Sequence, residues 1–296
     1  MPALGILDEL PPGYCVEAAR RGVMAVHADY VDALRSVSFG PEGGETLVES
    51  ELAGRAPLYE LTAGDERLLV RRFHHGGLLR WATGKRFADP ERPFRELVVS
   101  AALAEAGVRT PLVVGARSRR APIGGWYLEL VTRRVDDVLD LGLWLHRLQS
   151  IGITAPARGR VLHAVGELVG RLHAVGLLHA DLQPKNVLLG ADFAHASEPS
   201  LWIIDLDRST LRERLSTAQR RANLRRLFRA AARRAPFLTG SDHRRFLAGY
   251  GRGLGERLAW KEEWRAILAE HRRRRSAHSL GWVFERAFAG EPARRS

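Results

Sequence analysis

A polar loop interrupts two apolar segments between Leu177 and Leu189, where the chain reads LLHADLQPKNVLL. In this loop Asp181 precedes Asn186 by five residues, and nineteen residues later Asp205 ends the apolar stretch LWIID. Mg²⁺ prefers one or two carboxylates together with phosphate oxygens and water, so Asn186 and Asp205 can supply ligands. Asp181 can accept a hydrogen bond from an attacking hydroxyl. This spacing predicts a site that holds a metal-bound triphosphate beside a general base.

The pattern His-x-Asp-Leu-x-x-x-Asn followed by Ile-Asp resembles the catalytic and metal loops of the protein-kinase-like superfamily. The resemblance implies a kinase that uses ATP and Mg²⁺, with Asp181 as the catalytic base and Asn186 and Asp205 as the metal ligands. Lys185 lies in the same loop, and we count it among the catalytic residues because it could meet a phosphate. His179 is expected to be structural and to hold the loop by hydrogen bonds.

The same resemblance requires a basic residue on a strand, an acid on a helix and a glycine-rich turn in the upstream half. Arg71 in RLLVRRF stands where the superfamily usually has lysine, and Glu96 in FRELVV supplies the acid. Together they would orient the α- and β-phosphates, although the bulkier arginine fork could change the nucleotide pose. Two turns remain open as the phosphate cover, namely the one around Gly54 and the segment GPEGG at residues 40–44.

The elements that must position these residues fall into two halves. Residues 57–73 predict two strands around a turn at Gly64, residues 92–107 a helix that ends at Gly107, and residues 109–116 and 125–132 two more strands. After about Arg134 the pattern is helical, with an apolar face in residues 158–176. The resemblance implies an α+β, protein-kinase-like bilobal fold with a small β-rich N-lobe and a larger helical C-lobe. We expect an N-terminal extension at 1–50, the N-lobe at 51–134 and the C-lobe at 135–296, with a basic helical C-terminal part.

The composition narrows the class of protein. The chain has one cysteine, Cys15, which excludes an intramolecular disulfide framework. For the same reason we do not expect a cysteine-based zinc site. The first residues carry no signal-peptide pattern and no stretch approaches a membrane span, so we expect a cytoplasmic protein that is soluble or bound to a surface. The formal net charge of +12 is almost entirely arginine, which favours a polyanionic partner or simply a solvated basic surface.

Departures from the protein-kinase pattern point to another acceptor. Ala180 replaces the arginine that usually pairs with an activation-loop phosphate, and Asp207 stands where Asp-Phe-Gly has its glycine. The segments VRRFHHGGLLR, FRELVVSAALAEAGVRTP, HADLQPKNVLL, IIDLDRS and NLRRLFRA resemble, in this order, the lipopolysaccharide-core kinases of the 3-deoxy-D-manno-octulosonic acid (Kdo) kinase type. This resemblance implies transfer of the γ-phosphate of ATP to a sugar hydroxyl of the lipopolysaccharide precursor, Kdo-lipid A, at the cytoplasmic face of the inner membrane.

The basic segment from Leu211 to Arg234 fits an anionic membrane surface. It holds nine arginines, and its predicted helix has an apolar stripe of Leu224, Leu227, Phe228 and Ala231. We expect Arg225, Arg226, Arg229 and Arg233 to lie mostly off this stripe, where each could contribute roughly 1 kcal/mol to binding an anionic leaflet. A core-packed helix with a solvated basic face is the competing interpretation, and the two are compatible.

Other functions remain open at this stage. A small-molecule phosphotransferase related to aminoglycoside or choline kinases also favours a small residue before the catalytic aspartate, but it would need an acidic acceptor pocket. A pseudokinase that binds nucleic acid or membrane is disfavoured because Asp181, Asn186 and Asp205 are all present. No nucleic-acid partner is expected, since Phe228 is the one aromatic residue of the basic segment. The oligomeric state is left open.

Overall fold

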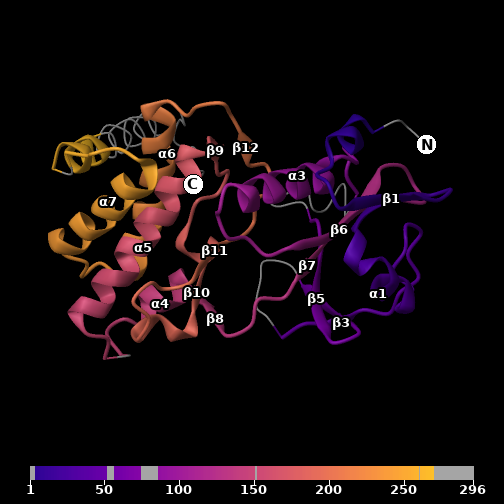
Figure 1. Cartoon of the computed structure of the whole chain (residues 1–296), viewed down its shortest axis with the longest axis horizontal. Helices are drawn as coiled ribbons and strands as arrows, with labels where there is room; N and C mark the ends of the chain where they lie inside the picture. Colours follow the sequence, from indigo (N-terminus) through magenta and orange to yellow (C-terminus); the bar gives the residue numbers. More distant parts are fainter. Residues whose placement is uncertain (1–3, 52–56, 75–85, 151, 260, 270–296) are drawn as a thin grey trace, which may run out of the picture.

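The computed structural model of the chain describes residues 4–51, 57–74, 86–150, 152–259 and 261–269. The molecule is elongated, with a β-rich half and a helical half joined where β7 leads into β8 (Figure 1). The β-rich half contains one long helix, α3, which lies across the sheet. This arrangement confirms the predicted α+β fold with a β-rich N-lobe and a helical C-lobe.

The N-lobe is built on an antiparallel sheet in which seven described strands follow the order β1-β2-β6-β7-β5-β4-β3. The strands are β1 Tyr14–Ala18, β2 Gly22–His27, β3 Val48–Glu49, β4 Leu58–Ala63, β5 Glu66–Arg72, β6 Val113–Arg120 and β7 Trp126–Arg133. The two strands predicted around Gly64 are therefore present as β4 and β5. Gly64 has a φ of 63°, a conformation that glycine adopts without steric cost.

Helices cover both faces of this sheet. Helix α3 (Arg92–Glu105) and the 3-10 helix η1 (Gly5–Glu9) pack on one face, where Phe94 and Leu97 are fully buried. The other face is covered by η2 (Ala28–Tyr30) and α1 (Val31–Ser36), which bury Leu34 together with Phe39. Apolar burial on both faces fixes the strand that carries Arg71 and the helix that carries Glu96 relative to each other.

Residues 1–50 contribute directly to the N-lobe sheet. Strand β2 pairs with β6, for example Met24 with Arg117, and β1 continues the sheet beyond β2. The sheet thus contains strands from the stretch that we expected to be an N-terminal extension, as well as strands from 51–134. The domain boundaries that we drew at residues 50 and 134 stay a prediction.

The face of the sheet that α1 covers holds a buried ionic cluster centred on Glu129. Arg117 is fully buried, donates to Glu129 at 2.7 Å and to Glu45 at 2.6 Å, and lies over the Phe39 ring. Burial acts to raise the pKa of Glu129, but the surrounding arginines hold it below its ordinary value. The carbonyl of Gly40 also accepts from Arg117, at 2.7 Å. The GPEGG turn is therefore bound to the same face of the sheet as Arg117, and which of the two glycine turns covers the phosphates stays a prediction.

The C-lobe consists of a helical core and two small sheets. Its helices are α4 Leu141–Arg147, α5 Ala155–Ala174, α6 Thr217–Arg234 and α7 Gly240–Leu254, with the 3-10 helices η3 Pro184–Asn186 and η4 Ala191–Ala194. One sheet has the order β11-β10-β8 (Leu201–Ile203, Val187–Gly190, Val138–Asp140), and β9 (Leu177–Leu178) pairs with β12 (Thr210–Leu211). Side-chain caps begin all four of these α-helices: Asp140 caps α4, Thr154 caps α5, and capping boxes at Ser216 and Thr239 begin α6 and α7.

Helices α5 and α7 lie side by side at backbone contact distance (Figure 1). A Cβ atom on Gly166 would lie 2.0 Å from the carbonyl oxygen of Phe246, and one on Gly249 would lie 1.9 Å from that of His163. Only glycine at these positions allows so close an approach. The pair supports the loop of residues 179–186, the candidate catalytic loop, which follows α5 after the short strand β9.

Helix α6 has the predicted apolar stripe, but one of its arginines does not lie where the sequence predicted. Leu224 and Leu227 are buried in the C-lobe core, while Arg229 and Arg233 are exposed. Arg225 is only 9% exposed, because its position on the helix faces the core beside Leu224. The prediction that it lies on the solvent-facing side is therefore wrong. Among the described residues, none of the helices has the length and apolar character to cross a bilayer.

Candidate active site

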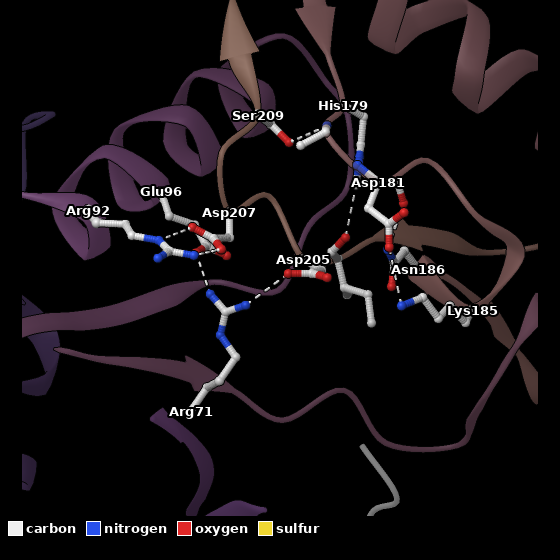
Figure 2. A network of polar contacts seen from close by, with 12 residues as sticks. Arg71, Arg92, Glu96, His179, Asp181, Lys185, Asn186, Asp205, Asp207 and Ser209 are labelled. Carbon is white, nitrogen blue, oxygen red and sulfur yellow. Dashed lines mark hydrogen bonds and ion pairs between the residues drawn. The ribbon is translucent and has the colours of Figure 1, made fainter. Parts of the chain in front are cut away.

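The catalytic loop and the second acidic loop are brought together by the β10–β11 ladder. Val187 pairs with Ile203, and the amide of Ile204 donates to the carbonyl of Asn186 at 3.0 Å. Asn186 precedes one strand and Asp205 follows its antiparallel partner, so the two residues lie at the same end of the ladder. Figure 2 shows Asp205 beside the loop that carries Asp181, Lys185 and Asn186.

His179 links the two loops in a single tautomer. Its Nδ1 accepts from the Asp181 amide at 3.1 Å, which places its proton on Nε2, and Nε2 lies 3.2 Å from the carbonyl oxygen of Ile204 (Figure 2). Burial lowers the pKa of His179, so the ring stays neutral and keeps this donor and acceptor pattern. The geometry matches the structural role expected for His179, since its ring fixes the backbone on both sides of the site.

The carboxylate of Asp181 is oriented by two side chains of its own loop. Gln183 Nε2 donates to one carboxylate oxygen at 2.5 Å, and Lys185 Nζ lies 3.3 Å from the other. The side chain of Asp181 is one-third exposed, so an incoming hydroxyl can reach it. Asn186 Nδ2 donates to the Asp181 carbonyl at 2.8 Å, which directs the amide oxygen of Asn186 away from that carbonyl. A carboxylate held in this way can accept a proton from an alcohol.

Arg71 connects the N-lobe to the acidic loop of the C-lobe. Its guanidinium forms an ion pair with Glu96 of α3 and a 3.0 Å hydrogen bond with Asp205 (Figure 2). Burial raises the pKa of the Glu96 carboxyl to about 7, although the adjacent guanidinium acts to lower it. Arg72, the next residue, turns to the opposite face and contacts Glu129 at 3.0 Å. Arg71 is thus the strand residue that faces the cleft side, as its predicted role requires.

A second arginine fixes α3 against the same loop. Arg92, the first residue of α3, forms a two-pronged ion pair with Asp207, whose Oδ1 lies 2.6 Å from Arg92 Nε. Both side chains are less than one-fifth exposed, and the Arg92 guanidinium lies over the rings of Phe73 and Phe87 at 5.2 and 5.0 Å. Two ion pairs one helical turn apart, at Arg92 and Glu96, therefore hold α3 in place.

A layer of buried polar groups supports the catalytic loop from behind. Asn223 of α6 accepts from the His179 amide at 3.1 Å and donates to the His179 carbonyl at 3.0 Å. His173 lies between Asn223 and Tyr250, 2.9 Å from the tyrosine hydroxyl, and burial lowers its pKa to about 4. The amide of Ala180 donates to the hydroxyl of Ser209 at 3.2 Å. These bonds tie the loop to α5, α6 and α7.

The residues present fit a hard divalent cation. Asn186 and Asp205 place an amide oxygen and a carboxylate at the same end of the β10–β11 ladder, and Mg²⁺ needs few protein ligands because phosphate oxygens and water complete its shell. Asp205 has a φ of 61°, a conformation that is uncommon outside glycine and that sites of function often retain. No group of three or more His, Cys, Asp or Glu side chains suited to a metal occurs among the described residues.

The structure brings together six of the seven residues selected from the sequence: Arg71, Glu96, Asp181, Lys185, Asn186 and Asp205. Gly54, the seventh, lies outside the described residues, between β3 and β4. Sequence reasoning missed Gln183, Arg92 and Asn223. Gln183 was within the quoted loop and could have been found there, whereas nothing in the sequence links Arg92 or Asn223 to the loops that they contact.

A comparison with models of known families decides the assignment. The model of the lipopolysaccharide kinase (Kdo/WaaP) family matches residues 45–250. The chain belongs to this family. It is therefore a phosphotransferase with an alcohol group as acceptor, as the resemblance predicted.

Individual relatives agree with the family. The 3-deoxy-D-manno-octulosonic acid kinase of Xanthomonas oryzae pv. oryzae (strain PXO99A) is 28% identical over 228 residues, which cover 73% of this chain and 85% of the relative. The enzyme of the same name from Actinobacillus succinogenes is 26% identical over 187 residues, covering 61% and 74%. A solved structure of WaaP in complex with acyl carrier protein matches with a TM-score of 0.57 and 22% identity, covering 82% of this chain and 90% of that chain. This last similarity establishes the protein-kinase-like fold.

Proposed function

We propose that this enzyme transfers the γ-phosphate of ATP, with Mg²⁺, to a Kdo hydroxyl of the lipopolysaccharide inner core. The observation that carries the proposal is the carboxylate of Asp181, which is oriented by Gln183 and Lys185 and lies beside the pair Asn186 and Asp205. The names of the relatives support the choice of Kdo as the acceptor sugar.

In the proposed reaction each residue has a distinct task. Asp181 accepts the proton of the sugar hydroxyl as the oxygen attacks phosphorus, and Lys185 offers a positive charge to the transferred group. Asn186 and Asp205 would hold Mg²⁺, which neutralises phosphate charge when it is bound. Arg71, held by Glu96, would contact the α- and β-phosphates, so its second bond to Asp205 is expected to yield to the nucleotide.

The acceptor in this proposal is anchored in a membrane, so the enzyme would act as a peripheral protein on the cytoplasmic face of the inner membrane. The exposed arginines of α6, Arg229 and Arg233, support an electrostatic contact with anionic lipid. Binding to vesicles should then need anionic lipid and should weaken as salt rises, because the screening length shortens from about 8 Å at physiological ionic strength to about 3 Å at 1 M.

The deciding experiment offers the purified protein γ-labelled ATP and Mg²⁺ with Kdo-lipid A, free sugars, aminoglycosides, choline and a generic protein substrate. Label should enter Kdo-lipid A in the wild type, and Asp181→Asn should lower the rate by about 10² to 10⁴ with ATP binding retained. Asp205→Asn should also weaken Mg²⁺-dependent ATP binding. Asp192→Asn, an exposed aspartate outside the site, is the matched control. Label entering an aminoglycoside or choline instead would establish the small-molecule phosphotransferase.

A further inference from the structure

A second concave surface lies on the C-lobe, away from the site described above. It is a groove of about 850 Å³ lined by residues of α5 and α7 together with residues 107–109, 197–199 and 201. Among the described residues, six arginines line it: Arg109, Arg160, Arg171, Arg244, Arg245 and Arg252. None of the residues of the catalytic loop or of the loop that carries Asp205 is part of this lining. The groove is therefore chemically separate from phosphoryl transfer.

The positive charge of the groove is not neutralised within the described part of the chain. Two glutamates are present, and one of them, Glu167, already contacts Arg171 at 2.6 Å and Arg252 at 3.6 Å. Arg244 and Arg245 are exposed and have no carboxylate within 4.0 Å among the described residues. An anionic ligand would replace only water around these two guanidinium groups, so its binding would not break an existing ion pair.

The spacing of the arginines defines the shape of the ligand. Arg160 and Arg171 are eleven residues apart on α5, which corresponds to about 16 Å along the helix axis, and Arg245 and Arg252 on α7 are about 10 Å apart. A single phosphate group cannot span such distances. Between the arginines the lining is apolar and small, with Ala164, Leu168 and Ala248. The groove thus fits an elongated polyanion that has an apolar side.

Three classes of occupant do not match this surface. A bilayer cannot enter a concave groove, and none of the exposed large apolar side chains of the described chain belongs to the lining. Single-stranded nucleic acid is disfavoured because the lining contains no Phe, Tyr or Trp on which bases could stack. The C-terminal residues 271–296 of the chain itself carry seven arginines and two glutamates, so their net positive charge would be repelled by the arginines of the groove.

We propose that this groove is a docking site for an acidic amphipathic helix of a partner protein. A helix of about eleven residues spans 16 Å, so carboxylates on one face can meet the arginines of α5 and α7 while small apolar residues cover Ala164 and Ala248. The arginine fork binds carboxylates with two parallel hydrogen bonds, which gives such a contact its specificity. Docking here leaves the catalytic loop open to its acceptor.

The test uses the full chain and a fluorescein-labelled helical peptide of fourteen residues with glutamates on one face and alanine and leucine on the other. Anisotropy should show binding that weakens with salt, and the variant with Arg244→Ser and Arg245→Ser should bind at least about tenfold more weakly. The matched control, Arg229→Ser with Arg233→Ser, removes the same charge from exposed positions of α6 and should change the affinity less than about twofold. Thermal unfolding followed by circular dichroism checks that both variants are folded.

Further arms separate other anions from the peptide. Pyrophosphate and vesicles of phosphatidylglycerol are offered to the same variants. Pyrophosphate should bind the groove variant and the α6 control to a similar extent, whereas the vesicles should bind the groove variant like the wild type and the α6 control more weakly, as the proposed lipid contact of Arg229 and Arg233 requires. The proposal is overturned if the peptide does not bind, if both double variants lose affinity equally, or if vesicle binding is what the groove variant selectively loses. Phosphoryl transfer is measured in parallel and should be unchanged in the groove variant, so a failure of the proposed kinase reaction would leave the peptide result intact.

Discussion

Arg71 and Arg72 are neighbours on β5 with opposite environments, so replacing each by methionine is a stringent test of the site. Arg71 holds Glu96, which is 6% exposed, and Asp205. Arg72 contacts Glu129, but that carboxylate keeps Arg117 at 2.7 Å after Arg72 is removed. The two substitutions remove the same charge and nearly the same volume. Their consequences should differ because only one of them leaves a buried carboxylate without its cation.

The size of the effect follows from the carboxyl left behind. An ionised, unpaired Glu96 would destabilise the fold by roughly 3–5 kcal/mol. The carboxyl can instead take up a proton, and because its pKa in the folded protein is already about 7 with Arg71 in place, full protonation adds less than about 1 kcal/mol at pH 7 and less still at pH 5.5. Arg71→Met should therefore lower the free energy of unfolding by about 1–2 kcal/mol at pH 7, mostly through the lost hydrogen bonds, with a smaller loss at pH 5.5. Arg72→Met should cost about 1 kcal/mol.

Activity separates the two variants further. Without Arg71 the nucleotide phosphates lose one preorganised cation, so kcat/KM for ATP should fall by about 10² to 10³, whereas Arg72→Met should stay within about tenfold of the wild type. Urea unfolding at pH 5.5 and 7 and steady-state kinetics at saturating acceptor give both quantities. Equal kinetic losses in the two variants, or a stability loss for Arg71→Met that grows as the pH falls, would refute this reasoning.

Three more predictions concern the support of the site. Burial lowers the pKa of His173 to about 4, so below pH 6.5 the unfolded chain binds a proton at this residue that the folded chain does not bind. The free energy of unfolding should therefore fall by about 2 kcal/mol between pH 7.5 and 5. In urea unfolding, His173→Gln should remove this part of the pH dependence. Gly166→Ala would place a Cβ 2.0 Å from a carbonyl oxygen of α7 and should cost 1–3 kcal/mol or more, whereas Gly240→Ala, with open space around it, should be neutral or stabilising; equal melting temperatures would contradict the close packing. A double-mutant cycle of Arg92→Ala and Asp207→Ala should give a coupling of about 1–3 kcal/mol in unfolding, and a value near zero would show that this ion pair does not fix α3.

Local patterns carried most of the fold prediction. The turn at Gly64, the helix that ends at Gly107 and the catalytic loop between two apolar segments each rest on signals within about twenty residues. The pairing of β2 with β6 joins segments about ninety residues apart, and no local pattern specifies that contact. For this reason residues 1–50 looked like an extension, although they supply strands to the sheet.

The site shows the same limit. The loop spacing predicted that Asp181, Asn186 and Asp205 lie near one another, and they do because the ladder that joins their loops is short, while their roles stay a prediction. Arg225 was expected at the surface because hydrophobic periodicity alone cannot tell which residues flanking an apolar stripe become buried by neighbouring helices. Asn223 bonds the backbone of His179 from forty-four positions away, and only the packing of α6 against the loop reveals it.

The arginines between the two lobes, Arg71 and Arg92, give a physical reason why an alanine can precede Asp181 in the sequence. The DLDRS loop must be held relative to α3 by charge, and in this chain both anchors are carboxylates of the loop itself: Asp205 meets Arg71, and Asp207 meets Arg92. These charges are present as soon as the chain folds, and the Ala180 amide is held by the Ser209 hydroxyl without any charge at position 180. No added phosphate is needed to hold α3 against the loop. In this structure α3 and the DLDRS loop are thus held together by ion pairs within the chain, without a charge at position 180.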